Sequence, residues 1–371
     1  MTSLRPTVVG ISVGTWFFKT PLFKTASCRK GPGSRNAFKA LFSGVLATGT
    51  LLMGIAVASD ADEPNALSPP PTSKLTLMLD WYVNPTHGPV IVAKQQGFFR
   101  ERGLEVEIRT PADPTAPPKL VAAGREDLAL SYQPQLHLQV DQGLPVKRVG
   151  TLIATPLNVL MVRADSDIEV FADLEGKKVG YSVGGLEEVL LAAMLDHAGL
   201  TLADIEPVNV NFALTPALIS RRVDAVTGAF RNFEPAQLAE EGVEGRPFFI
   251  EEQGIPLYDE LIFLAATDTL DEKRERISRF LAAIEQATMW IVNHPDRGWE
   301  AFRQYDASLD NEVNEKAWQA SIARFALRPA ALDARRYRDF ERFLLERGVI
   351  QARTPLARLA EDINDPGTDG E

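Results

Sequence analysis

Short apolar runs of strand character alternate with stretches of helical periodicity along most of this chain. This alternation limits the possible folds more than any other feature, because strands that alternate with helices form βαβ units around a largely parallel sheet. The first series predicts strands at residues 75–79, 105–109, 128–131, 147–152 and 159–163, and helices at residues 90–102, 117–123 and 135–142. The sequence therefore predicts an α/β fold.

A second series of the same kind begins at residue 178, and the 371 residues exceed what one hydrophobic core usually holds. It predicts strands at 178–182, 208–210, 225–228 and 259–266, and helices at 187–197, 213–221, 233–241 and from 271 onward. We therefore expect two α/β lobes with a ligand cleft between them and a helical C-terminal region. The expected boundaries are 74–163 for the first part of lobe 1, 164–258 for lobe 2, 259–350 for the completion of lobe 1 with the C-terminal helices, and 351–371 for a polar tail.

The first 58 residues have the features of an export signal. Residues 1–59 contain seven Lys or Arg and no acidic residue, and an apolar stretch over 40–58 ends in the small-x-small pattern Ala-Val-Ala that signal peptidase cuts. The alternative is a single membrane span, which needs about 20 apolar residues. The cleavage pattern favours the signal, so we expect a leader over 1–58, a flexible acidic, Pro-rich tether over 59–73, and a periplasmic mature protein.

The rest of the chain is acidic and contains no cysteine. Beyond residue 59 it carries 32 of the 39 basic and all 50 acidic side chains, a formal charge of −18, which disfavours nucleic acid as a partner. The only cysteine, Cys28, lies in the expected leader, so we expect no disulfide, no thiolate metal site and no lipid anchor at the cleavage point. The four histidines lack the paired spacing of a metal site, and we expect no metal and no cofactor.

The segment LTLMLDWYVNPTHGPV, residues 75–90, places polar and aromatic side chains between an expected strand and an expected helix. In open α/β sheets, ligands bind at this edge. The indole of Trp81 suits a planar heterocycle, although a role in core packing is the alternative. Asn84 supplies an amide, and His87 supplies a donor at the helix start, where free backbone amides also occur. We expect these three side chains in a ligand pocket.

A series of motifs extends from this segment: LDWYVNPTHGPVIVAKQQGFFRERGLEVEI, PADP, LVAAGREDLALSYQPQLHL, GLPVKRVGTLI, PLNVLMV and DLEGKKVGYSVGG. From about residue 75 to about residue 293 the chain resembles the pyrimidine-precursor binding proteins of thiamin-related ABC importers, whose enzymatic relatives are the fungal synthases of the thiamin pyrimidine. The resemblance implies a type II periplasmic binding protein fold. It also implies that Asn84, Tyr132, Asn232, Glu234 and the segment 258–260 face the pocket.

Side chains that match an aminopyrimidine occur at further expected strand ends. This heterocycle presents an amino donor beside a ring-nitrogen acceptor, which an amide pairs through two opposed hydrogen bonds, whereas a carboxylate accepts from the amino group. For Asn232 a helix N-cap and for Glu234 an acid in the first helical turn are the structural alternatives. The candidates are Tyr132, Gln133, Asn158, Asn232, Glu234, Tyr258, Asp259 and Glu260.

The stretch GYSVG, residues 180–184, fits the G-x-S-x-G pattern of a hydrolase nucleophile elbow. A hydrolase of that order also needs an acid, a downstream histidine and an oxyanion loop, and the chain has only His197 and His294 after the motif and no H-G-G-G segment. We therefore expect no catalytic residue here. Nearby Glu187 and Glu188 favour a neutral or cationic ligand. The glycine-rich turn instead predicts ligand contacts through Ser182, Gly184 and Gly185.

These features together predict a periplasmic solute-binding component of an ABC importer and not an enzyme. The expected ligand is a thiamin-related aminopyrimidine of the hydroxymethyl- or formylamino-type, and the expected partners are permease subunits, with the binding protein a monomer. One alternative is a pyrimidine synthase, although the fungal synthases carry a cysteine-rich segment where this chain has IPLYDELIF. Another alternative is a binding protein for a different flat heterocycle such as riboflavin.

Overall fold

The computed structural model describes residues 71–364. The expected leader over 1–58, with its alternative as a membrane span, lies outside the described residues, as do most of the tether and the last seven residues of the tail. Within 71–364, no helix is long and apolar enough to cross a membrane.

The first lobe is built on a five-stranded mixed sheet in the order β2-β1-β3-β10-β4. β1 runs parallel to β2 and β3, whereas β10 runs antiparallel to β3 and β4. The expected helix over 90–102 is two helices, because Gly97 adopts a left-handed conformation with φ +81° between them. The elements are β1 Ser73–Met78, α1 Gly88–Gln95, α2 Phe98–Glu101, β2 Leu104–Arg109, α3 Pro117–Ala122, β3 Leu128–Ser131, α4 Gln133–Asp141, β4 Val146–Ile153 and β10 Leu261–Ala266.

The second lobe is built on another five-stranded mixed sheet, in the order β7-β6-β8-β5-β9. β6 runs parallel to β7 and β8, and β5 runs antiparallel to β8 and β9. The sequence did not predict β9, because its residues GRPFF include a glycine and a proline; an edge strand tolerates both. The elements are β5 Asn158–Arg163, β6 Lys178–Tyr181, α5 Leu186–His197, β7 Glu206–Asn209, α6 Leu214–Ile219, β8 Ala225–Phe230, α7 Glu234–Glu240 and β9 Gly245–Phe249.

The chain passes from the first sheet to the second earlier than the sequence predicted. β5 was expected within lobe 1, but it pairs with β8 and β9, so the first crossing segment covers residues 154–157. The second crossing segment, residues 250–260, returns the chain to β10. An apolar run such as NVLMVR identifies a buried strand but does not identify the sheet that it joins.

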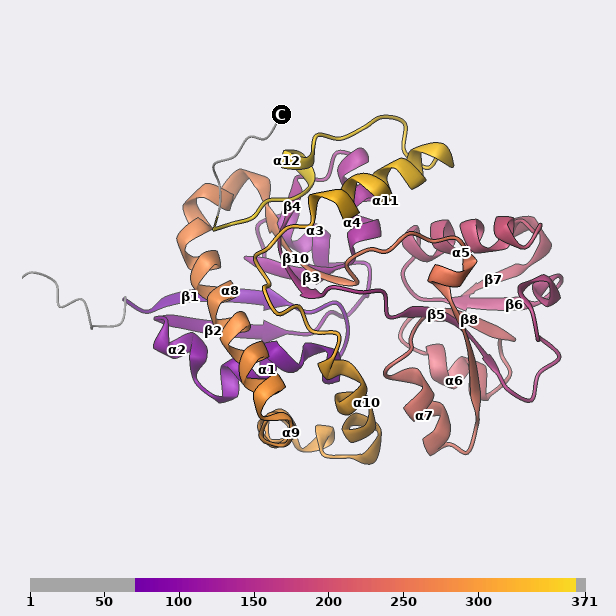
Figure 1. Ribbon diagram of the computed structural model, residues 1–371, viewed down its shortest axis with the longest axis horizontal. Coiled ribbons are helices and arrows are strands. Elements are labelled where there is room, and N and C mark those ends of the chain that lie inside the picture. Colours follow the sequence, from indigo (N-terminus) through magenta and orange to yellow (C-terminus); the bar gives the residue numbers. More distant parts are fainter. Residues whose placement is uncertain (1–70, 365–371) are drawn as a thin grey trace, which may run out of the picture. The chain divides into compact units, whose positions relative to one another are not determined.

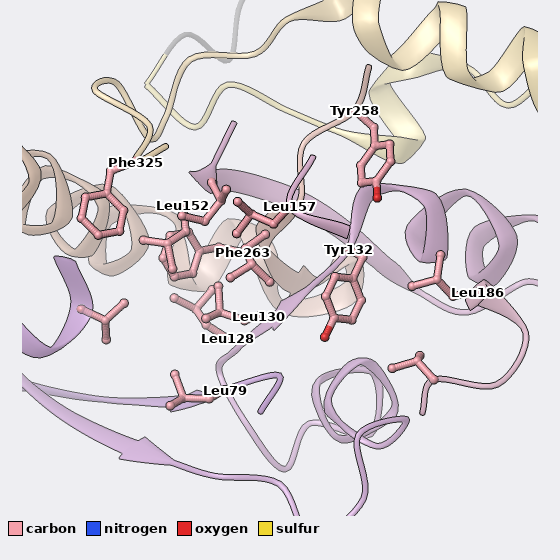
Figure 2. Packing of buried hydrophobic residues seen from close by; sticks show 14 of the residues in the cluster. Leu79, Leu128, Leu130, Tyr132, Leu152, Leu157, Leu186, Tyr258, Phe263 and Phe325 are labelled. Atoms are coloured by element: carbon pink, nitrogen blue, oxygen red, sulfur yellow. The ribbon is translucent and has the colours of Figure 1, made fainter. Parts of the chain in front are cut away.

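A helical C-terminal region covers the first lobe. Its elements are α8 Leu270–Asn293, α9 Pro295–Arg303, α10 Glu312–Ile322, α11 Ala334–Glu346 and α12 Leu356–Leu359. Figure 1 shows the long helix α8 lying across the side of the first sheet that carries α1 and α2, and α8 contacts both helices. A buried cluster in this lobe surrounds Phe263, and Figure 2 shows its continuation through Tyr132 and Tyr258 to Leu186 of the second lobe.

Arg148, on β4, joins the end of the chain to the first sheet. Its side chain is fully buried, and its guanidinium donates to the main-chain carbonyls of Ala330 at 3.0 Å, Pro329 at 3.2 Å and Glu361 at 3.0 Å. It also donates to the carbonyl of Ala331 and to the Thr151 hydroxyl.

The expected polar tail over 351–371 is packed on the first lobe as far as residue 364. Leu359 and Ala360 are 2% exposed, and Ala360 forms a parallel bridge with Arg148. Glu361 pairs with Lys147 at 3.1 Å and with Arg274. The composition suggested a solvated tail because the apolar residues in this segment are few, but Leu359, Ala360 and Ile363 are buried against the first lobe.

Candidate ligand-binding site

A narrow cavity is lined by residues of both lobes. The parallel strands β1 and β3 of the first lobe, and β6 and β8 of the second, end at this cavity, as ligand sites in open α/β sheets do. Its lining residues are Asp80, Trp81, Asn84, Tyr132, Asn158, Val183, Leu186, Glu187, Leu214, Gly228, Phe230, Phe233, Glu234 and Glu260.

Asp80 follows β1, and its carboxylate is held by two donors. The hydroxyl of Tyr132 donates to Oδ2 at 3.0 Å, and Nε2 of His87 donates to Oδ1 at 2.9 Å. Because Nδ1 of His87 accepts the backbone N–H of Asn84 at 3.2 Å, the ring proton lies on Nε2. Burial, with the adjacent Asp80 carboxylate, raises the pKa of Tyr132 well above its ordinary value, so this hydroxyl keeps its proton.

Aromatic rings form part of the cavity wall. Trp81 is 9% exposed, and its ring lies edge-on to Phe212 of the second lobe with centroids 4.5 Å apart. Phe230 and Phe233 add apolar surface from the second lobe. Tyr82, the other ring at the end of β1, is 38% exposed and does not line the cavity.

Glu260 is the last residue of the second crossing segment, immediately before β10, and its carboxyl contacts the end of the first crossing segment. Its Oε2 accepts the N–H groups of Leu157 at 2.6 Å and Asn158 at 2.9 Å and the Tyr258 hydroxyl at 3.3 Å. Burial raises the pKa of Glu260 to about 7, although the three donors favour the charged form and oppose this rise. The side chain of Asn158 accepts the N–H of Gly228 at 3.2 Å, which ties the start of β5 to β8.

Two further glutamates face the cavity from the second lobe. Glu234 begins α7, and its Oε2 accepts the N–H of Phe230 at 2.6 Å. Burial raises the pKa of Glu234 to about 7. Glu187 lies in the first turn of α5, and burial raises its pKa to about 8. With Asp80 and Glu260 the lining therefore holds four carboxyl groups and neither lysine nor arginine.

Six of the residues predicted from the sequence line this cavity. They come from both lobes and from the crossing segments: Trp81, Asn84, Tyr132, Asn158, Glu234 and Glu260. The side-chain amide of Asn84 also forms hydrogen bonds with neighbouring residues: its Oδ1 accepts the Thr86 N–H at 2.9 Å, and its Nδ2 donates to the Tyr82 carbonyl at 3.1 Å. Contact of these six side chains with a ligand stays a prediction.

The other eight predicted residues do not line the cavity. His87 is fully buried behind Asp80, and Gln133 accepts the Asp259 N–H at 2.8 Å. Asp259 itself pairs with Arg336 and accepts from Thr151. Of the remaining five, three form hydrogen bonds with other residues. The hydroxyl of Ser182 donates to the Asn211 carbonyl, the Asn232 amide donates to the Ser321 hydroxyl, and the Tyr258 hydroxyl donates to Glu260. The other two, Gly184 and Gly185, are exposed.

These positions also bear on the hydrolase and metal alternatives. Ser182 is 2% exposed, and no histidine is among its hydrogen-bond partners in residues 71–364. His137 on α4 packs against Tyr337 and Phe340, and burial lowers its pKa to about 4. In the part of the chain that the structure describes, no group of three or more His, Cys, Asp or Glu side chains is placed to hold a metal ion.

Sequence reasoning missed eight lining residues: Asp80, Val183, Leu186, Glu187, Leu214, Gly228, Phe230 and Phe233. Asp80 and Glu187 stand within predicted site segments, so an acid beside a strand end was an available signal for both. The apolar residues and Gly228 carried no such signal, because they resemble ordinary core positions in the sequence.

Comparison with known proteins gives close relatives. The model of the NMT1/THI5-like family matches residues 84–298. A Haemophilus influenzae protein whose name assigns it to thiamine biosynthesis is 50% identical over 78% of this chain and 92% of its own length. The formylaminopyrimidine-binding protein of Halalkalibacterium halodurans is 35% identical over 67% of this chain and 75% of its own. A 4-amino-5-hydroxymethyl-2-methylpyrimidine phosphate synthase of Saccharomyces cerevisiae is 26% identical over 69% of this chain and 78% of its own length.

Solved structures of the same fold are more distant in sequence. The alkanesulfonate-binding protein SsuA of Xanthomonas axonopodis superposes with a TM-score of 0.63 at 15% identity, over 78% of this chain and 98% of that one. The fold is therefore that of the periplasmic binding proteins, as the sequence predicted. With the family match over more than half of its length and the two bacterial relatives above, the chain belongs to the NMT1/THI5-like family.

Proposed function

We propose that this protein is the solute-binding component of an ABC importer and captures a thiamin-related aminopyrimidine of the hydroxymethyl- or formylamino-type. The observation that carries the proposal is a cavity lined by both lobes that joins aromatic walls to four carboxyl groups. Its chemistry suits a flat ligand with amino donors. The relative named for binding formylaminopyrimidine supports the same ligand class.

The charge of the side chains that line the cavity favours this ligand class over anionic ligands. A sulfonate or a phosphate carries a negative charge, and the lining offers it four acids and neither lysine nor arginine. An uncharged or cationic aminopyrimidine meets no such repulsion. This disfavours a sulfonate, and it also disfavours the synthase alternative, whose product in the yeast relatives is a pyrimidine phosphate.

Transport without chemical change requires closure of the two lobes on the ligand and reopening at the permease. Ligand contacts from both lobes stabilise the closed state relative to the open one. The proposal places the mature protein in the periplasm as a monomer without a lipid anchor, and permease subunits are its partners. Hinge motion takes place at the two crossing segments, residues 154–157 and 250–260.

The test of this function is identification of the ligand. Mass spectrometry after native purification, followed by calorimetry with formylaminopyrimidine, 4-amino-5-hydroxymethyl-2-methylpyrimidine and riboflavin, compares the candidates directly. We expect tight binding of an aminopyrimidine, recovered unchanged. Binding of riboflavin alone would contradict the ligand class, and conversion of a bound precursor into a new product would contradict transport.

Replacement of Trp81 by alanine is expected to weaken aminopyrimidine binding by at least about threefold, because ring stacking contributes about 0.5–1.5 kcal/mol beyond area burial. Calorimetry on the folded variant measures the effect. Trp299→Ala is the matched control, since Trp299 is a partly buried tryptophan on α9 that does not line the cavity, and it is expected to bind as the unaltered protein does. Equal affinities for the Trp81 variant and the unaltered protein would remove the indole from the site.

A further inference from the structure

Glu187 has an unusual position for an acid, because its carboxyl fills a space that any side chain at residue 228 would need. The residue is 4% exposed and lines the cavity from the first turn of α5. Gly228 on β8 faces it with φ +86°, and a Cβ built on Gly228 would lie 2.6 Å from the Glu187 carboxyl carbon. A glycine at this position is therefore needed for the carboxyl to reach the cavity.

The two oxygens of the Glu187 carboxyl differ in their surroundings. Oε2 accepts the N–H of Ser182 at 2.6 Å. Oε1 lies against Gly228. Because Oε2 is occupied as an acceptor, a proton bound by this carboxyl resides on Oε1, beside Gly228, which also lines the cavity.

Neighbouring groups favour the protonated form of this carboxyl. Burial raises the pKa of Glu187 to about 8; the amides of Ser182 and Val183 oppose this rise, and the negative charges of Glu260 and Glu188 add to it. Tyr132 also faces it and stays uncharged. No cation is among the residues that line the cavity with it.

We propose that Glu187 acts as a carboxylic acid in the ligand site and donates a hydrogen bond from Oε1 to a ring nitrogen of the heterocycle. This inference rests on the proposed function and names how that site selects its ligand. An aminopyrimidine then receives a proton donor at its ring nitrogen from Glu187, and its amino group donates to the carboxylate of Glu234. A heterocycle without an exposed ring-nitrogen acceptor leaves the buried donor of Glu187 unpaired and binds more weakly.

The geometry determines which substitution preserves this interaction. In Glu187→Gln the side-chain oxygen must take the Oε2 position to accept the Ser182 N–H, which turns the amide NH₂ toward the cavity. Glutamine therefore reproduces the donor of the protonated acid but cannot ionise. Glu187→Met keeps a similar length and removes the donor. Glu188→Gln is the matched control, because it makes the same substitution one residue away, at a side chain that does not line the cavity.

The experiment is calorimetry with 4-amino-5-hydroxymethyl-2-methylpyrimidine and formylaminopyrimidine at several values from about pH 7 to about pH 9.5, on variants whose melting temperatures show that they fold. We expect Glu187→Gln to bind within about threefold of the unaltered protein at pH 7, and Glu187→Met to bind about tenfold more weakly. Above about pH 8, affinity of the unaltered protein and of Glu188→Gln should fall by up to about tenfold for each pH unit as Glu187 ionises. Glu187→Gln should lack this fall.

A loss of tenfold or more in Glu187→Gln at pH 7 would show that Glu187 binds as a carboxylate and would overturn the inference. An unchanged affinity in Glu187→Met, or the same alkaline fall in Glu187→Gln as in the unaltered protein, would overturn it as well. In each of these outcomes the unaltered protein still binds an aminopyrimidine, so the proposed function stands. Failure of the unaltered protein to bind either aminopyrimidine would overturn both.

Discussion

Exchange of Arg148 for methionine is expected to lower the free energy of unfolding by at least about 3 kcal/mol, because several buried carbonyl groups lose a donor at once. Those carbonyls belong to residues 329–331 and to Glu361, which lie on two separate segments of the C-terminal region. Methionine fills most of the volume of the side chain but supplies no donor. Urea denaturation followed by circular dichroism measures the loss.

The matched control for this prediction is Lys147→Met, on the same strand. Lys147 is partly exposed and contacts Glu361 as a simple ion pair, which contributes about 0–1 kcal/mol. Proteolysis locates the effect, since the Arg148 variant should be cleaved after residue 323 sooner than the control. A loss of less than about 1 kcal/mol in Arg148→Met would show that these carbonyls find other partners, and would refute the anchoring role.

Exchange of Glu234 for glutamine is expected to weaken aminopyrimidine binding about 10- to 100-fold. The backbone N–H of Phe230 keeps the amide oxygen in the Oε2 position, so the NH₂ group faces the cavity and meets the amino group of the ligand, a donor against a donor. Leaving such groups unpaired in a buried site costs about 1–3 kcal/mol. Calorimetry at about pH 8, where Glu234 with its pKa of about 7 is mostly ionised, measures the difference.

Glu240→Gln is the control for this variant, because Glu240 lies on the same helix and is exposed. The sign of the pH effect adds a second readout. As the pH falls below about 7, Glu234 gains a proton and loses its capacity as an acceptor, so the affinity of the unaltered protein should fall on the acid side more than that of Glu234→Gln. Binding by Glu234→Gln within about threefold of the control would exclude Glu234 as the acceptor.

The two glutamates of the second lobe are therefore expected to respond in opposite ways to the same substitution. In both, one oxygen accepts a backbone N–H and the other faces the ligand. Glutamine preserves the interaction of Glu187, which donates, and reverses that of Glu234, which accepts. The pair offers a test of hydrogen-bond polarity in which the size of the side chain is kept at both positions.

Most of the fold was predictable from local periodicity. Alternating runs such as LTLM, and amphipathic stretches such as the one in α5, identified their elements to within a few residues. β9 was missed because Gly245 and Pro247 read as a loop, and only its place at the sheet edge makes them acceptable. The prediction that β5 belongs to the first lobe was wrong, because the pairing of a strand depends on residues far away in the sequence, which periodicity does not identify.

The candidate site was predictable only in part. Strand ends that carry Trp81, Tyr132 or Glu234 indicated the edge of each sheet at which the cavity lies. They did not reveal which side chains are already engaged by neighbours, as Asn232 is by Ser321 of α10. The role of Gly228 depends on the approach of α5 to β8, which is a tertiary contact. One sequence without the fold gives no access to such contacts.

The connection between the two sheets has a consequence for the order in which the lobes can be completed during synthesis. All five strands of the second sheet come from residues 158–249, so that half of the molecule has its full set of strands while the ribosome is still adding the next hundred residues. The first sheet waits for β10 and for the bridge at Ala360. A nascent chain interrupted before β10 would therefore hold the complete set of strands of the second sheet and a first sheet with an open gap between β3 and β4.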